Sequence, residues 1–166
     1  MSETLRSQWA DTVRAAPDAL AIVDGATGSR VTRAELDDRA NRWREKYGAT
    51  LAGQTVVLAE PNGVDWFCVF LGLLRSDAVV VPLDPGEPRS AQQATAAAIR
   101  AGWLWTGGVL ESIASRPRAA GDGRRIVKLT SGSTGTPRAL RFTDAQMLAD
   151  GRQVCAGMDI RANDVN

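Results

Sequence analysis

The chain has 166 residues, of which 44% are hydrophobic and 23% are charged, and its formal net charge at pH 7 is +1. This length is enough for one domain with its own core, and a charge this close to zero gives no general attraction for nucleic acids or anionic membranes. The sequence contains no histidine, which excludes a Ser-His or Cys-His catalytic pair and a His-ligated metal within this chain.

Signals for export, membrane insertion and metal binding are absent from the sequence. The N-terminus has no basic segment followed by an apolar one. The most apolar segment, Val64 to Leu74, is shorter than the roughly 20 residues that span a bilayer. The two cysteines, Cys68 and Cys155, do not have the spacing of metal ligands, and Cys68 is predicted to be a core residue. We therefore expect a cytoplasmic protein without a metal site of its own.

A helix, a β-hairpin and a second helix are predicted at the start of the chain. Ser2 to Ala16 has apolar residues at a spacing of four, and Pro17 ends that helix. The run from Ala19 to Val23 and the pair Arg30-Val31 flank a turn, as in a hairpin. Thr32 and Glu35 then have the spacing of a capping box. The second helix that begins there is predicted to end at Gly48.

The middle of the chain alternates between strand and helix patterns. Thr55 to Ala59 and Ala78 to Pro82 read as buried strands, and Asp65 to Leu74 reads as a helix covered on most sides. Two strands joined by a helix imply parallel pairing and a right-handed crossover. Pro88 to Ala101 and Trp103 to Thr106 predict a further helix and strand.

An arginine-rich stretch from Ala114 to Arg125 follows. It contains four arginines and one acid, Asp122. We interpret it as a solvated connector in preference to a ligand-binding patch. The final helix is predicted over Asp144 to Met158, with Thr143 as its cap.

The stretch with the clearest chemistry runs from Thr130 to Arg138. An apolar run, Arg125 to Leu129, leads into it, and its residues are Thr130, Ser131, Gly132, Ser133, Thr134, Gly135, Thr136, Pro137 and Arg138. Glycines let successive backbone N–H groups surround an anion, hydroxyls add donors, and arginine holds phosphate oxygens through its planar fork. A solvent-exposed Ser/Gly/Thr linker is the alternative that this composition also fits.

Together these patterns predict an α/β fold: a layered, mostly parallel sheet flanked by helices, with an N-terminal β-hairpin. Ligands of such sheets bind at the carboxyl ends of the strands. The Thr130–Arg138 loop leaves a strand at its carboxyl end, so its position and its chemistry agree.

Residues Thr130 to Pro137 resemble the signature loop of the adenylate-forming (AMP-dependent synthetase/ligase) family, which includes acyl-CoA synthetases and peptide-synthetase adenylation domains. Four other segments resemble the family as well: Thr32 to Arg42, Pro61-Asn62, Phe67 to Leu74, and Val81 to Pro85. The chain departs from the family at Arg138-Ala139, where Lys-Gly is usual, and at Asp144, where a His is common.

The resemblance implies that this loop wraps the β- and γ-phosphates of ATP, bound with Mg²⁺ in the full-length parent. The site residues it implies are Thr130, Ser131, Gly132, Ser133, Thr134, Gly135, Thr136 and Arg138. The parent would activate a carboxylic acid and pass it to a thiol acceptor, either CoA or a carrier protein. Residues 1–166 would form a single N-terminal subdomain, truncated relative to the family, without catalytic residues and inactive alone.

A non-catalytic, degenerate module of the same fold, used for binding or assembly, is the alternative. The truncated sheet edge is also expected to favour self-association. Two other classes are excluded by motif. Gly102 and Gly107 have P-loop spacing but are followed by Gly108 where lysine is required, and the Gly-x-Ser-x-Gly motif of serine hydrolases is absent.

Overall fold

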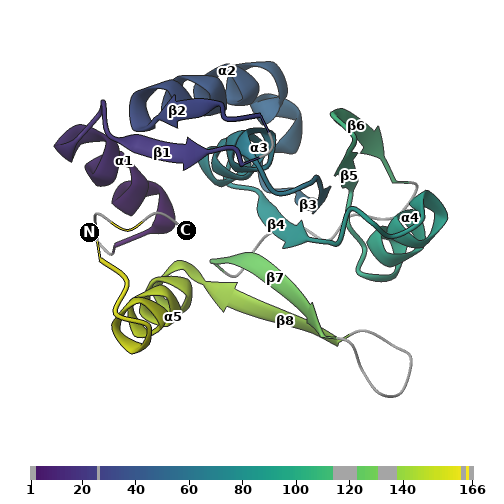
Figure 1. Ribbon diagram of the computed structural model, residues 1–166. Coiled ribbons are helices and arrows are strands. Elements are labelled where there is room, and N and C mark those ends of the chain that lie inside the picture. Colours follow the sequence, from purple (N-terminus) through teal and green to yellow (C-terminus); the bar gives the residue numbers. More distant parts are fainter. Residues whose placement is uncertain (1–2, 26, 114–122, 131–137, 162–163, 165–166) are drawn as a thin grey trace.

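The computed structural model describes residues 3–25, 27–113, 123–130, 138–161 and 164, which form five helices and eight strands (Figure 1). In chain order these are α1 (Leu5–Ala15), β1 (Leu20–Val23), β2 (Arg30–Thr32), α2 (Arg33–Leu51), β3 (Thr55–Ala59), α3 (Val64–Arg75), β4 (Val79–Pro82), α4 (Arg89–Ala98), β5 (Trp103–Thr106), β6 (Val109–Ser112), β7 (Arg124–Thr130), β8 (Arg138–Thr143) and α5 (Asp144–Gly157). No helix in these ranges has the length and hydropathy needed to cross a membrane.

A six-stranded mixed sheet organises the chain, in the order β6-β5-β3-β4-β7-β8. The three inner pairs, β5–β3, β3–β4 and β4–β7, are parallel, whereas the outer pairs, β6–β5 and β7–β8, are antiparallel. The N-terminal hairpin β1–β2 forms a separate antiparallel pair. The predicted fold class and the strand–helix–strand units are therefore confirmed.

Four details differ from the sequence predictions. Strands β6 and β8 were not predicted; each returns antiparallel beside its predecessor. Arg124 and Arg125 belong to β7 instead of the connector, and Asp77 Oδ1 lies 3.1 Å from the guanidinium of Arg125. Helix α2 continues past Gly48 to Leu51. Gly48 is buried where a Cβ would lie 2.8 Å from Ser76 Oγ, so it serves close packing and does not end the helix.

Helices cover both faces of the sheet. One core cluster joins Val56, Leu58 and Val80 of the strands to Val69 and Leu73 of α3. On the other face, Val57, Val81 and Val127 pack with Ala96 of α4. Burial on both sides explains why β3 and β4 read as continuous apolar runs.

Residues of the Thr32–Arg42 segment stabilise the fold through a capping box and a hydrogen-bond network. Thr32 and Glu35 form the predicted capping box. Asp37 accepts from Trp9 Nε1 at 2.7 Å and from the guanidinium of Arg75, and Arg75 also donates to Asn41 Oδ1 at 2.8 Å. One carboxylate therefore connects α1, α2 and the end of α3.

We expect Asp37→Ala to lower the free energy of unfolding by about 2–3 kcal/mol, because the indole and a mostly buried guanidinium lose their shared acceptor. The side chains of Arg75 and Asp37 are only 14% and 21% exposed. Urea denaturation followed by tryptophan fluorescence measures the change. Asp38→Ala, at the exposed neighbour, is the matched control and should change stability little. Equal effects of the two substitutions would contradict the role given to Asp37.

The two cysteines should differ in reactivity. Cys68 is buried, as predicted, and Cys155 is exposed. Burial raises the pKa of the Cys68 thiol, and the nearby Asp65 carboxylate raises it further. Because only the thiolate attacks a disulfide reagent, we expect one fast and one protected thiol in the native chain. Labelling with a chromogenic aromatic disulfide measures both, and Cys155→Ser should remove only the fast phase.

The raised pKa of Cys68 also has a consequence for stability. The folded chain retains the thiol proton at a pH where the unfolded chain releases it, so this contribution is complete below the unfolded pKa of about 8.5 and is lost as pH rises through the folded pKa. Cys68→Ala should therefore flatten the fall in stability above about pH 8.5. An unchanged slope would contradict this assignment.

Candidate phosphate-binding site

The two described ends of the Thr130–Arg138 segment face each other across a strand pair. Thr130 is the last residue of β7, Arg138 is the first of β8, and the two are register partners. The hydroxyl of Thr130 lies 3.5 Å from the carbonyl oxygen of Arg138. Ser131, Gly132, Ser133, Thr134, Gly135, Thr136 and Pro137 lie outside the described residues.

This segment begins at the carboxyl edge of the sheet. β7 runs parallel to β4, with Ile126 beside Val80, and β4 runs parallel to β3. Thr130 therefore lies at the same edge as the residues that follow Pro82 and Ala59. The expectation that the loop leaves its strand at a ligand-binding edge agrees with this topology.

A hollow of about 270 Å³ lies at this edge, between the ends of β4 and β7. Its lining comes from β4 and the turn after it, from α4, and from the end of β7: Pro82, Leu83, Asp84, Glu87, Thr95, Leu129 and Thr130. Two hydroxyls, Thr95 and Thr130, can donate to an anion, and two carboxylates, Asp84 and Glu87, repel one. A hollow of this size accommodates part of a nucleotide.

The turn after β4 is held by several hydrogen bonds. Asp84 Oδ1 accepts from the backbone N–H of Gly86 at 2.8 Å. Gln92, on α4, donates through Nε2 to the carbonyl of Pro85 at 3.3 Å and to that of Glu87 at 2.9 Å. These bonds fix the wall that carries Asp84 and Glu87.

A third carboxylate near this edge is already engaged. Glu60 follows β3, and its Oε2 accepts from Trp105 Nε1 at 3.0 Å and from the backbone N–H of Gly108 at 3.1 Å. Glu60 therefore holds the β5–β6 hairpin in place, whereas Asp84 and Glu87 line the hollow.

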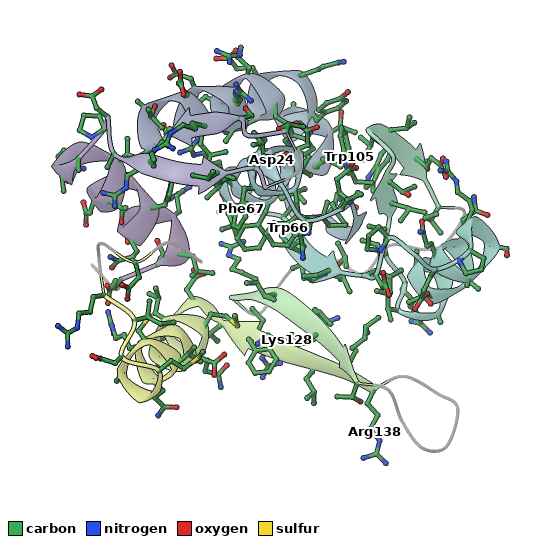
Figure 2. All side chains as sticks on the ribbon, in the orientation of Figure 1. Asp24, Trp66, Phe67, Trp105, Lys128 and Arg138 are labelled. Carbon is green, nitrogen blue, oxygen red and sulfur yellow. The ribbon has the colours of Figure 1, made fainter. Side chains whose placement is uncertain are left out.

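The cations near the loop occupy different environments. Lys128 Nζ lies 3.5 Å from Asp150 Oδ2 and 5.1 Å from the centroid of the Phe142 ring. Arg138 is exposed, and Figure 2 shows its side chain projecting away from the body of the protein at the start of β8. Among the described residues its guanidinium has no ion-pair partner. The described conformation does not bring Arg138 into the hollow.

Two further arginines, those at the start of β7, lie at the opposite edge of the sheet. Arg124 and Arg125 begin β7, so about six strand residues, or roughly 20 Å, separate them from Thr130. Arg125 donates to the carbonyl of Asp77 at 2.9 Å as well as pairing with its carboxylate. These two arginines were predicted to lie in a solvated connector and instead belong to β7, where Arg125 is held by Asp77.

Sequence reasoning did not select Asp84, Glu87, Thr95 or Gln92. A signal existed for Asp84, since it closely follows a predicted strand and must lie near that strand's carboxyl end. Glu87, Thr95 and Gln92 reach the hollow or its wall only through the path of the turn and α4. Strand β8 also had a signal, because Leu140 and Phe142 alternate with Ala139 and Arg141.

Comparison of the sequence with known protein families finds a match. The family model described as "AMP-binding enzyme" matches residues 9–123, which is the scaffold up to the start of β7 and excludes the Thr130–Arg138 loop.

Among curated proteins, the hybrid PKS-NRPS synthetase mpsA of Macrophomina phaseolina is 31% identical over 154 residues, covering 78% of this chain and 4% of mpsA. The long-chain-fatty-acid–CoA ligase FadD13 of Mycobacterium tuberculosis is 28% identical over 185 residues, covering 89% of this chain and 36% of FadD13. The chain thus spans a minor part of these relatives.

Among solved structures, O-succinylbenzoate coenzyme A synthetase (MenE) from Bacillus subtilis, in complex with AMP, aligns with a TM-score of 0.78 at 16% identity. The alignment covers 98% of this chain and 48% of the MenE chain. At this identity the likeness concerns the fold.

Proposed function

Because the chain belongs to the family of AMP-binding enzymes, whose model matches residues 9–123, we propose that it forms the ATP phosphate-binding part of an adenylate-forming enzyme. The observation that carries the proposal is the location of Thr130 and Arg138, the two described ends of the segment. They are register partners at the carboxyl edge of the sheet, and Thr130 lines the hollow there.

The proposed contacts follow from the chemistry of the segment. The backbone N–H groups of its glycines and neighbours hold the β- and γ-phosphates, because donors in such a loop form an anion nest. The residues in this role are Thr130, Ser131, Gly132, Ser133, Thr134, Gly135, Thr136 and Arg138. Arg138 swings from its exposed position onto a terminal phosphate oxygen, which its long, rotatable side chain allows.

The whole enzyme would use ATP with Mg²⁺ to activate a carboxylic acid and transfer it to a thiol. FadD13 is named for joining a fatty acid to CoA, and mpsA for peptide and polyketide synthesis, so CoA or a carrier protein is the acceptor class that we propose. Adenylation also requires alignment of the carboxylate with the α-phosphate, and the described residues around the hollow offer two hydroxyl donors and two carboxylates but no cation for this alignment. We expect residues 1–166 alone to bind without catalysing.

A non-catalytic module of the same fold is the second candidate. Two observations favour it: Arg138 projects away from the hollow, and Asp144 occupies the first turn of α5. A carboxylate there stabilises a helix N-terminus, so Asp144 has a structural use where family members commonly carry a histidine. In this reading the scaffold binds or assembles with a partner and the loop holds no nucleotide.

An ATP titration separates the two candidates. We expect millimolar MgATP to shift the amide NMR signals of residues 130–138, with other signals nearly unchanged. Arg138→Ala should weaken binding about three- to tenfold, the loss expected for one ordinary hydrogen bond that is exchanged with water. Arg14→Ala, at an exposed arginine of α1, is the control. Unshifted loop signals would favour the non-catalytic module, and an unaltered affinity of the Arg138 variant would remove that residue from the site.

The acidic wall gives a second test. Without divalent cations we expect Asp84→Asn to strengthen ATP binding about two- to fivefold, because a carboxylate about 8 Å from a phosphate costs roughly 0.5 kcal/mol per unit charge in water. Asparagine keeps the acceptor for the Gly86 N–H, so the turn should persist.

Isothermal titration with and without Mg²⁺ measures this effect. The difference should shrink with Mg²⁺, which neutralises phosphate charge. Asp18→Asn, at an exposed position, controls for net charge. Unchanged affinity of the Asp84 variant would place the phosphates away from this wall.

A further inference from the structure

Gln92 is an unusual residue for the buried side of α4. It is 3% exposed and lies one turn from Ala96, which is fully buried against the sheet. Its Oε1 is buried and has no hydrogen-bond partner among the described residues. Because an unpaired buried carbonyl is unfavourable, an apolar side chain would suit the packing better. The advantage of glutamine over an apolar residue at this position must therefore come from the hydrogen bonds that its Nε2 donates.

That end binds the turn between β4 and α4, which has few other restraints. Two of its residues, Pro85 and Pro88, have no backbone N–H, and Pro88 caps α4 without a side-chain hydrogen bond. Within the turn, Glu87 N donates to the Asp84 carbonyl at 3.3 Å, and Gly86 N donates to the Asp84 side chain. Among the described side chains, only that of Gln92 joins this turn to α4 by hydrogen bonds.

We propose that Gln92 is a positioning residue for the nucleotide site. By holding the carbonyls of Pro85 and Glu87, it fixes Asp84 and Glu87 as one wall of the hollow whose other wall is Leu129 and Thr130. The width of the hollow beside the phosphate loop is then set before ligand arrives. This inference rests on the proposed function, since the wall affects ATP only if ATP binds at Thr130–Arg138.

Gln92→Met is the direct test, because methionine has similar length but donates no hydrogen bond. It also removes the unpaired carbonyl, so the thermal midpoint should move by less than about 3 °C. Amide exchange at Gly86 and Glu87 should become about tenfold faster, and the Kd for MgATP should rise about fivefold, because binding must now order the turn. The matched control is Gln93→Met. Gln93 is the exposed neighbour on α4, and its Nε2 lies 3.3 Å from Oε2 of Glu111 in β6.

Gln92→Glu adds a test that a purely structural role would not satisfy. At pH 8 its carboxylate would face two carbonyl oxygens and release the turn. At pH 5.5 a buried carboxyl that has gained a proton can donate to one of them, which should restore affinity. We expect the Kd ratio of variant to wild type to fall from about fivefold at pH 8 to about twofold at pH 5.5. If Gln92→Met does not fold, the change in this Kd ratio between pH 8 and pH 5.5 still tests whether Gln92 positions the turn.

The outcomes are distinct. Wild-type protein that binds no ATP overturns the proposed function and this inference together. Wild-type protein that binds ATP, while Gln92→Met exchanges faster at the turn but binds equally well, overturns only the inference and makes Gln92 a packing residue. Equal Kd ratios for Gln92→Glu at the two pH values overturn it as well. The inference is supported if Gln92→Met binds MgATP more weakly while Gln93→Met does not, and if the affinity of Gln92→Glu recovers at pH 5.5.

Discussion

Parallel pairing of β7 with β4 is the constraint on which the candidate site depends. It puts the end of β7 beside the end of β4, so residues more than forty positions apart line one hollow. Had β7 paired antiparallel, Thr130 would lie at the edge occupied by Thr55, opposite the turn that carries Asp84. The chemistry of the loop is local in sequence, but its surroundings are a consequence of strand direction.

The carboxyl edge is built from connections with different tasks. The turn after β3 supplies Glu60, which holds the β5–β6 hairpin. The turn after β4 supplies two carboxylates to the hollow and is itself held from below by Gln92. β7 supplies the start of the loop that we propose to bind phosphate. Negative charge therefore gathers on one side of the proposed phosphates and donors on the other, which favours a ligand that brings its own cation.

Sequence reasoning predicted what depends on local pattern. The βαβ units, the capping box at Thr32, the N-cap at Thr143 and the buried Cys68 followed from periodicity, spacing and composition. It did not predict β6 or β8, since short edge strands carry weak patterns. It assigned Gly48 to a helix end because glycine has two uses, and only the neighbouring Ser76 decides between them. Gln92 looked like one polar residue of a helix; its burial depends on contacts that sequence spacing does not encode.

The match to the family model covers the scaffold and one wall of the hollow, but not the loop. Residues 9–123 include the network in which Asp37 joins α1, α2 and α3, and they end before the loop proposed to hold phosphate. A residue such as Asp37, with a near-buried arginine and an indole as partners, tolerates little change. Arg138 has no such partner among the described residues and can differ without loss of the fold. The departure at Asp144 also stabilises the start of α5, so it bears on stability as well as on chemistry. Ligand binding, and not stability, is therefore the measurement that decides between an enzyme part and a non-catalytic module.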